Sequence, residues 1–246
     1  MTHATPDPLE VESFSRARRE VLDRIAAAAA RAGRDVAGVT LVAVSKTVPA
    51  ARVRAAVAAG LDVLGENRVQ EAADKVSEVP GARWHLVGPL QSNKARRAVE
   101  LFDMIESVHD EDLAARLDGI VRTASGVRRL PVLLQVNVDR DVAKAGFSPE
   151  ALEPAMDRLL GLDGLDVRGL MTIGRLVADP REARPTFAAL RELSASLRAR
   201  WPGLGTELSM GMTDDYEVAV EEGATIVRVG RALFGERAAR PAAGGG

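Results

Sequence analysis

The stretch TLVAVSKTVPAARVRAAVAAGLDVL, residues 40–64, decides the fold because it holds one complete strand–helix–strand unit. Residues 39–44 and 61–64 are apolar runs with β-branched members, which predicts two buried strands. Residues 49–59, which begin with Pro49, carry a helical pattern. A strand, a helix and a second strand in this order predict parallel pairing, with the helix packed on the outside.

The same alternation continues along the chain. Further strand-like runs occur near 83–87, 103–105, 131–136, 166–170, 206–208 and 225–229, which makes eight strands. Helical patterns separate them, at about 66–78, 92–101, 110–124, 149–160, 180–199 and 213–222. Eight such units predict one α/β domain, a single (β/α)8 barrel of the TIM type. An open doubly wound sheet is the alternative.

The two ends of the chain differ from this repeating part. The segment from about Leu9 to Ala32 is expected to form an extra N-terminal helix that ends at Gly33. Residues 1–8 are expected to form a loose lead-in, residues 9–237 the barrel domain, and residues 238–246 a flexible tail.

Composition excludes several classes of function. The 246 residues include no cysteine, which excludes disulfides and thiolate–zinc sites, and three scattered histidines disfavour a catalytic zinc. Balanced charge (33 basic and 35 acidic residues) and 3% aromatic residues disfavour nucleic-acid binding. No stretch approaches the roughly 20 apolar residues of a membrane span, and the N-terminus lacks a secretory signal. We therefore expect a cytoplasmic protein with no nucleic-acid or membrane partner.

Unusual residues follow the predicted strands, at the end of a parallel barrel where functional groups gather. Lys46 comes two residues after the first strand. Gly211 and Gly230 follow strands seven and eight, where barrels commonly hold phosphate. Thr213 is expected to cap a helix that begins with Asp214, which would present backbone N–H groups to an anion. The alternative is that both glycines only permit tight turns.

Lys46 has two interpretations. An ordinary lysine after a strand lays its stem along apolar surface and keeps its ammonium group in water. A lysine in the mouth of the barrel, beside a phosphate site, could instead be a counter-ion or a Schiff-base nucleophile, and desolvation favours the neutral amine that the second role needs. A lysine and a phosphate pocket together suggest pyridoxal 5'-phosphate (PLP). A phosphate-ligand barrel enzyme without PLP stays open.

From about Val39 to Glu236, the chain resembles one known family. Four motifs carry the resemblance: AVSKT, GENRVQE, WHLVGPLQSNK and LSMGMTDDYEVAVEEGATIVRVGRALFGER. It resembles the PLP homeostasis protein family, single-domain relatives of the alanine racemase N-terminal barrel. The resemblance implies that Lys46 holds PLP as a Schiff base. The other PLP-binding residues that it implies are Asn67 and His85 near the ring, Met171 against one ring face, Arg228 facing the pyridine nitrogen, and Ser209, Met210, Gly211 and Gly230 at the phosphate.

The assignment of Arg228 limits the chemistry that the resemblance implies. A guanidinium stays protonated and only donates, so the pyridine nitrogen facing it would stay unprotonated and withdraw electrons poorly. Racemases of related fold add a second domain and a tyrosine from a partner subunit, whereas this chain ends soon after strand eight and its only tyrosine, Tyr216, lies on a predicted helix. The resemblance thus implies a monomeric PLP homeostasis protein with little or no turnover, with PLP-dependent apo-enzymes as recipients. A PLP-dependent racemase-like enzyme is the alternative.

Overall fold

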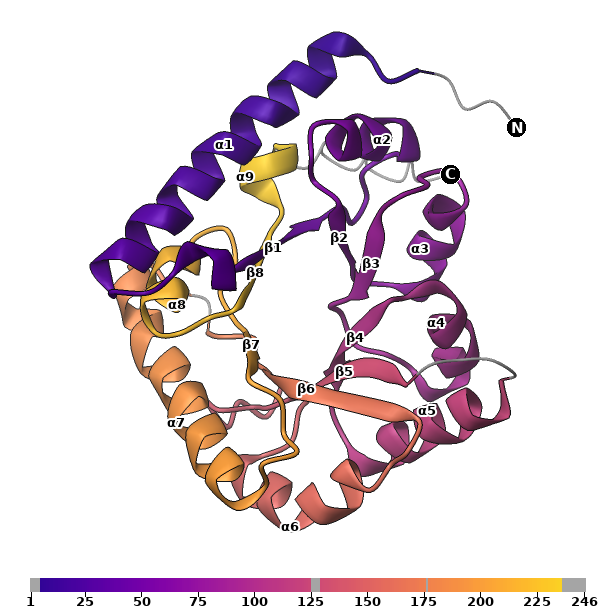
Figure 1. Ribbon diagram of the computed structural model, residues 1–246, viewed down its shortest axis with the longest axis vertical. Helices are drawn as coiled ribbons and strands as arrows, with labels where there is room; N and C mark the ends of the chain where they lie inside the picture. The colour runs from indigo at the N-terminus through magenta and orange to yellow at the C-terminus, as the bar shows by residue number, and fades with distance from the viewer. Residues whose placement is uncertain (1–4, 125–128, 176, 236–246) are drawn as a thin grey trace, which may run out of the picture.

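In the computed structural model, which describes residues 5–124, 129–175 and 177–235, parallel strands close into a barrel in the order β1 to β8 (Figure 1). The strands span Thr40–Val44 (β1), Val63–Glu66 (β2), Arg83–Leu86 (β3), Met104–Val108 (β4), Leu130–Gln135 (β5), Leu165–Met171 (β6), Glu207–Ser209 (β7) and Ile226–Val229 (β8). Pairing of β1 with β8, from Thr40 opposite Ile226 to Ala43 opposite Val229, closes the ring. The predicted (β/α)8 barrel is confirmed. The open sheet is wrong, because β1 and β8 pair with each other and neither is an edge strand.

The helices surround the ring of strands (Figure 1). They span Pro8–Arg31 (α1), Ala50–Ala58 (α2), Val69–Val76 (α3), Ala95–Leu101 (α4), Glu111–Thr123 (α5), Pro149–Leu160 (α6), Arg184–Arg200 (α7), Tyr216–Glu221 (α8) and Arg231–Phe234 (α9), with short 3-10 turns at Val36–Gly38, Ser92–Lys94 and Pro180–Ala183. Within the described ranges, none of these helices has the length and hydropathy that a membrane span requires.

Helix α1 is the extra N-terminal helix that the sequence predicts. The Asp7 side chain accepts the Leu9 N–H and caps its first turn, and Phe14, Val21 and Ile25 are buried on one face. Figure 1 shows α1 running along the outside of the barrel, beside α8 and α9. The expectations for residues 1–4 and for the tail, residues 238–246, fall outside the described residues.

The barrel interior is divided into an apolar part and a polar part. Successive side chains of a strand point to opposite faces, so one set from each strand fills the barrel. Side chains from six strands form a separate apolar cluster there with Val87: Val42, Val63, Met104, Leu133, Met171 and Ile226. Glu106 and Arg228 follow Met104 and Ile226 by two residues, so they project inward one step nearer the carboxyl ends of the strands.

The loop after β7 differs from its predicted form. Helix α8 begins at Tyr216, so the predicted cap at Thr213 and the first turn at Asp214 are wrong. Two side chains hold the loop in a turn instead: Asp215 accepts the Met212 N–H at 2.6 Å, and Thr213 accepts the Gly230 N–H at 3.3 Å. These contacts leave residues 212–214 outside the helix, where they line a cavity.

Candidate functional site

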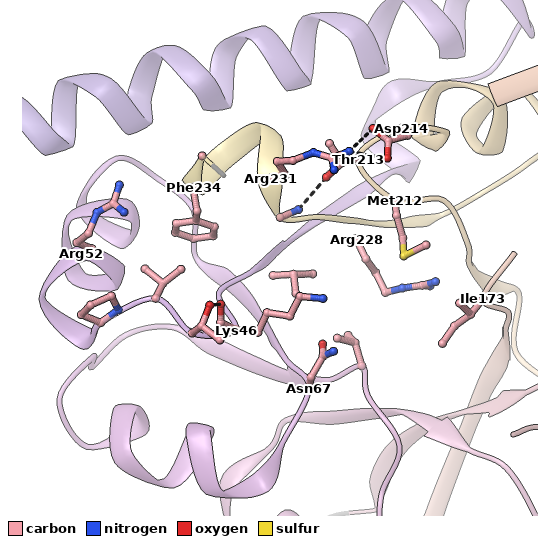
Figure 2. Close-up of a pocket in the computed structure, with 17 residues that line it drawn as sticks. Lys46, Arg52, Asn67, Ile173, Met212, Thr213, Asp214, Arg228, Arg231 and Phe234 are labelled. Atoms are coloured by element: carbon pink, nitrogen blue, oxygen red, sulfur yellow. Dashed lines mark hydrogen bonds and ion pairs between the residues drawn. The ribbon is translucent and has the colours of Figure 1, made fainter. Parts of the chain in front are cut away.

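A cavity of about 760 Å³ lies at the carboxyl ends of the strands. Its walls come from the segment after β1, from Asn67 after β2, from Ile173 after β6 and from the loops that follow β7 and β8. This volume is in the range of small-molecule sites, which are typically about 300–1,000 Å³. Lys46, Asn67 and Arg228 all project into the cavity (Figure 2).

Lys46 is held in a tight turn between β1 and α2. The Ser45 N–H donates to the Gly65 carbonyl of the neighbouring strand at 2.9 Å, and the Val48 N–H donates back to the Ser45 carbonyl at 3.0 Å. Thr47 has a φ of 65°, a left-handed conformation that is uncommon for a β-branched residue. The backbone on both sides of Lys46 is therefore fixed.

A buried ion pair supports this turn from outside the barrel. Lys75 of α3 donates to Glu66 at 2.6 Å and to the Ser45 carbonyl at 2.7 Å, while the Ser45 hydroxyl donates to the same Glu66 oxygen at 2.7 Å. Burial raises the pKa of Glu66, although the hydrogen bonds from Lys75 and Ser45 oppose this shift. The Glu66–Lys75 pair thus joins α3 to the residue that precedes Lys46.

Arg228 forms the opposite, buried wall of the cavity. One guanidinium nitrogen donates to the Ser209 hydroxyl at 2.5 Å and the other to the Thr172 carbonyl at 2.8 Å. Burial lowers the pKa of Arg228, and the negative charges of Glu106 and Asp215 oppose this shift. A guanidinium stays protonated even so, which makes Arg228 a fixed positive charge facing the cavity.

The loops after β7 and β8 form another side of the cavity. Gly230 precedes α9, and a Cβ atom there would lie 3.3 Å from the Val44 carbonyl oxygen. Gly211 has a φ of 88°, and a Cβ atom there would lie 2.5 Å from the Ala219 Cβ, so the loop passes close to α8. Asp214 pairs with Arg231 at the rim, as the dashed line in Figure 2 shows.

The nine residues named from the sequence separate into two groups. Lys46, Asn67, Arg228 and Gly230 line the cavity. The other five do not lie among its lining residues: His85, Met171, Ser209, Met210 and Gly211. The assignment of all nine residues to PLP stays a prediction.

The structure places these five residues in four different environments. Met171 belongs to the apolar cluster inside the barrel, and Met210 packs in the larger core between strands and helices. His85 and Ser209 point into the barrel below the cavity, where both contact Glu106. Gly211 forms the backbone turn that leads to the lining residue Met212.

Several lining residues and one central acid are not predicted from the sequence. Met212 and Ile173 line the cavity although neither has a polar group that marks a site. Glu106 is fully buried inside the barrel. An acid within the strand MIESV, residues 104–108, is the feature that marks this site in the sequence, but the predicted strand, 103–105, stops before Glu106. Among the described residues, no group of histidine, aspartate and glutamate is arranged to hold a metal ion.

Comparison with known proteins shows which family the chain matches. The model of the family "Alanine racemase, N-terminal domain" matches residues 21–238. The pyridoxal phosphate homeostasis protein of Pseudomonas aeruginosa is 47% identical over 220 residues, which cover 89% of this chain and 93% of that protein. Its namesake in Escherichia coli is 39% identical over 226 residues, or 89% and 94% of the two chains.

Solved structures agree with these matches. PipY of Synechococcus elongatus without PLP aligns with a TM-score of 0.78 and 45% identity, over 87% of this chain and 99% of that one. The PipY structure with PLP bound aligns with a TM-score of 0.76 and 44% identity, over 87% and 100%. An alanine racemase from Corynebacterium glutamicum, at 17% identity, has a TM-score of 0.69 over 92% of this chain and 62% of that one, which shows a common fold alone.

Proposed function

The chain belongs to the alanine racemase N-terminal domain family and, within it, to the pyridoxal phosphate homeostasis proteins, and from this premise we propose that it binds PLP in the cavity at the carboxyl ends of the strands. Lys46 is the proposed point of covalent attachment. The observation that carries the proposal is that Lys46 and Arg228 project into one cavity, beside the glycine-containing loop at Gly230.

The residues of the cavity fit the chemistry of PLP. PLP supplies an aldehyde that bonds to an amine, an electron-withdrawing ring, and a phosphate that anchors it. Lys46 offers the amine, Arg228 offers a buried positive charge, and the segment at Gly230 offers a close approach to backbone. Asp214, the acid of the rim, is already paired with Arg231, so the interior of the cavity favours an anion.

Each residue then has a proposed task. The Lys46 ε-amine would hold the aldehyde carbon of PLP, and the fixed turn around Lys46 places its side chain at the wall of the cavity. Arg228 holds the ring side as a donor that cannot give up its proton, and Asn67 lines the same region. The proposed set of PLP-binding residues also includes four at the phosphate, Ser209, Met210, Gly211 and Gly230, and two near the ring, His85 and Met171.

A spectroscopic experiment tests the attachment. We expect the protein with PLP to show the visible absorption band of lysine-bound PLP, and Lys46→Ala to lose it. The sequence contains four lysines, Lys46, Lys75, Lys94 and Lys144, so borohydride reduction and peptide mass mapping can assign the modified amine unambiguously. Lys94→Ala is the matched control, because Lys94 lies outside the cavity lining. Modification at another lysine, or no band with excess PLP, would refute the assignment.

The functional part of the proposal is homeostasis of PLP with little or no turnover. An unprotonated ring nitrogen opposite Arg228 would be a weak electron sink, which supports this part. The PLP-loaded protein should leave single enantiomers of a broad amino-acid panel unchanged, as measured by chiral chromatography. Racemisation that depends on Lys46 would establish the racemase-like alternative.

The same proposal extends to a monomeric, cytoplasmic protein that passes PLP to PLP-dependent apo-enzymes. Light scattering of the purified protein tests the monomer, and fractionation of cells tests the location.

For transfer, an apo-enzyme added to the PLP-loaded protein should regain activity faster than it does with the same concentration of free PLP in the presence of a PLP-trapping amine. Equal rates would remove transfer from the proposal.

A further inference from the structure

A buried polar network lies directly beneath the cavity. Glu106 of β4 accepts from His85 Nδ1 at 2.7 Å with one oxygen and from the Ser209 hydroxyl at 2.5 Å with the other. Ser209 in turn accepts from Arg228, whose guanidinium faces the cavity. Glu106 and Ser209 are fully buried, and His85 and Arg228 are nearly so. Four strands, β3, β4, β7 and β8, thus contribute to one connected group.

The direction of each hydrogen bond follows from the charge of Glu106. Although burial opposes it, the hydrogen bonds from His85 and Ser209 and the charges of His85 and Arg228 lower the pKa of Glu106, so this carboxylate only accepts. Ser209 must therefore use its single proton towards Glu106, which leaves a lone pair on its oxygen for Arg228. The chain of donors runs from Arg228 through Ser209 to Glu106.

This network differs from ordinary apolar packing inside a barrel because it buries charged groups and because it holds one of them in a fixed position. A buried charge without a counter-charge is strongly unfavourable, and Glu106 supplies the counter-charge to Arg228 from within the barrel. The Thr172 carbonyl holds the second nitrogen of Arg228. The guanidinium is therefore held at two points, and one of them depends on Glu106.

We propose that Glu106, acting through Ser209, is a positioning residue that fixes the Arg228 guanidinium at the cavity wall and so sets the affinity for the ring part of an aromatic aldehyde phosphate. This inference rests on the proposed function. It also gives Ser209 a task other than direct contact with the phosphate. The two tasks predict different results when the ring is removed from the ligand.

The experiment compares two ligands in equilibrium binding. PLP carries an aldehyde, a phosphate and a ring, whereas glycolaldehyde phosphate carries the aldehyde and the phosphate alone. We expect Glu106→Gln to raise the Kd for PLP by about tenfold or more, as for loss of a hydrogen bond to a charged group, and to leave the Kd for glycolaldehyde phosphate within about twofold. In an Arg228→Gln background, Glu106→Gln should add no further loss.

Ser209→Ala is the second variant and separates the two tasks of Ser209. The positioning role predicts the same ring-selective loss as in Glu106→Gln, whereas contact with the phosphate predicts equal losses for both ligands. Asp118→Asn is the matched control, because Asp118 is a buried carboxylate on α5 that accepts the Gly164 N–H. It should change neither affinity.

A ligand-independent readout distinguishes failure of this inference from failure of the proposed function. In NMR spectra of protein with 15N-labelled arginine, the Arg228 guanidinium protons should exchange slowly in the wild type and rapidly in Glu106→Gln. Unchanged exchange, equal losses for both ligands, or a full additional loss in the Arg228→Gln background would overturn the positioning role. Wild-type protein that binds no PLP would overturn the proposed function, and the exchange measurement would still decide the Glu106–Arg228 link.

Discussion

Thr47, the residue after Lys46, is in the left-handed region with a φ of 65°. A β-branched residue pays about 1 kcal/mol or more for this conformation, and such residues concentrate at functional sites. The Thr47 N–H donates to Glu71 at 3.2 Å and its hydroxyl donates to the Lys46 carbonyl at 2.6 Å, so side chains hold the strained turn. The turn directs Lys46 into the cavity rather than along the surface of α2.

Gly211 illustrates a position where a single methyl group is excluded. Gly211→Ala should destabilise the protein, because its φ is 88° and the added Cβ would lie 2.5 Å from the Ala219 Cβ and 2.9 Å from the Tyr216 Cα. We expect a loss of about 2 kcal/mol or more in the free energy of unfolding, measured with urea. Gly119→Ala in α5 is the control. It has nothing within 4 Å of an added Cβ and should stabilise the helix by about 0.5–1 kcal/mol. Equal effects at the two positions would contradict this account.

Glu106 gives the stability of the protein a defined dependence on pH. Its pKa in the folded state is lowered from the ordinary 4.5, because hydrogen bonds from His85 and Ser209 and the charges of His85 and Arg228 outweigh burial. The resulting stabilisation is complete above the ordinary pKa and is lost as the pH falls through the folded-state value. From about pH 6 to about pH 3, the wild type should therefore lose more unfolding free energy than Glu106→Gln. The unfolding free energy of both proteins is measured with urea across this pH range. Parallel pH profiles would contradict a stabilising role for the Glu106 carboxylate.

Helix α3 stabilises the Lys46 turn through one buried ion pair. Removal of one partner leaves an uncompensated buried charge, so Lys75→Met should cost about 3–5 kcal/mol of unfolding free energy. The double variant Glu66→Gln, Lys75→Met should lose less than Lys75→Met alone, because it removes the orphaned carboxylate as well. Lys94→Met replaces a partly exposed lysine and should change the unfolding free energy by no more than about 0.5 kcal/mol. Additive losses in the double variant would show that the pair is not coupled.

The barrel as a whole should be stabilised when the cavity is filled. A ligand that binds only the folded state at 100 times its Kd adds about 2.7 kcal/mol, which raises Tm by roughly 5–10 °C for a chain of this size. We expect this rise with PLP, and a smaller rise with pyridoxal at the same concentration because it lacks the phosphate. Lys46→Ala should reduce the PLP effect, measured by scanning calorimetry. The same Tm rise with PLP in Lys46→Ala would argue against attachment at Lys46.

The order of the strands and helices could be predicted from the sequence because each element is encoded locally. The apolar run at 40–44 and the helical pattern that follows it are properties of neighbouring residues, and their repetition implies a barrel. Lys46 and Gly230 could be placed in one region for the same reason: a parallel barrel brings the carboxyl ends of all its strands together.

The network beneath the cavity could not be predicted because it depends on how distant strands meet. Ser209 and Glu106 are 103 residues apart in the chain, and only the closed barrel points both side chains at one another. The loop after β7 is a similar case: Thr213 has the residue type of a helix cap, yet its hydroxyl accepts from Gly230, which follows another strand. A polar side chain takes the partner that the packed fold brings within about 3 Å, and local sequence does not contain that distance.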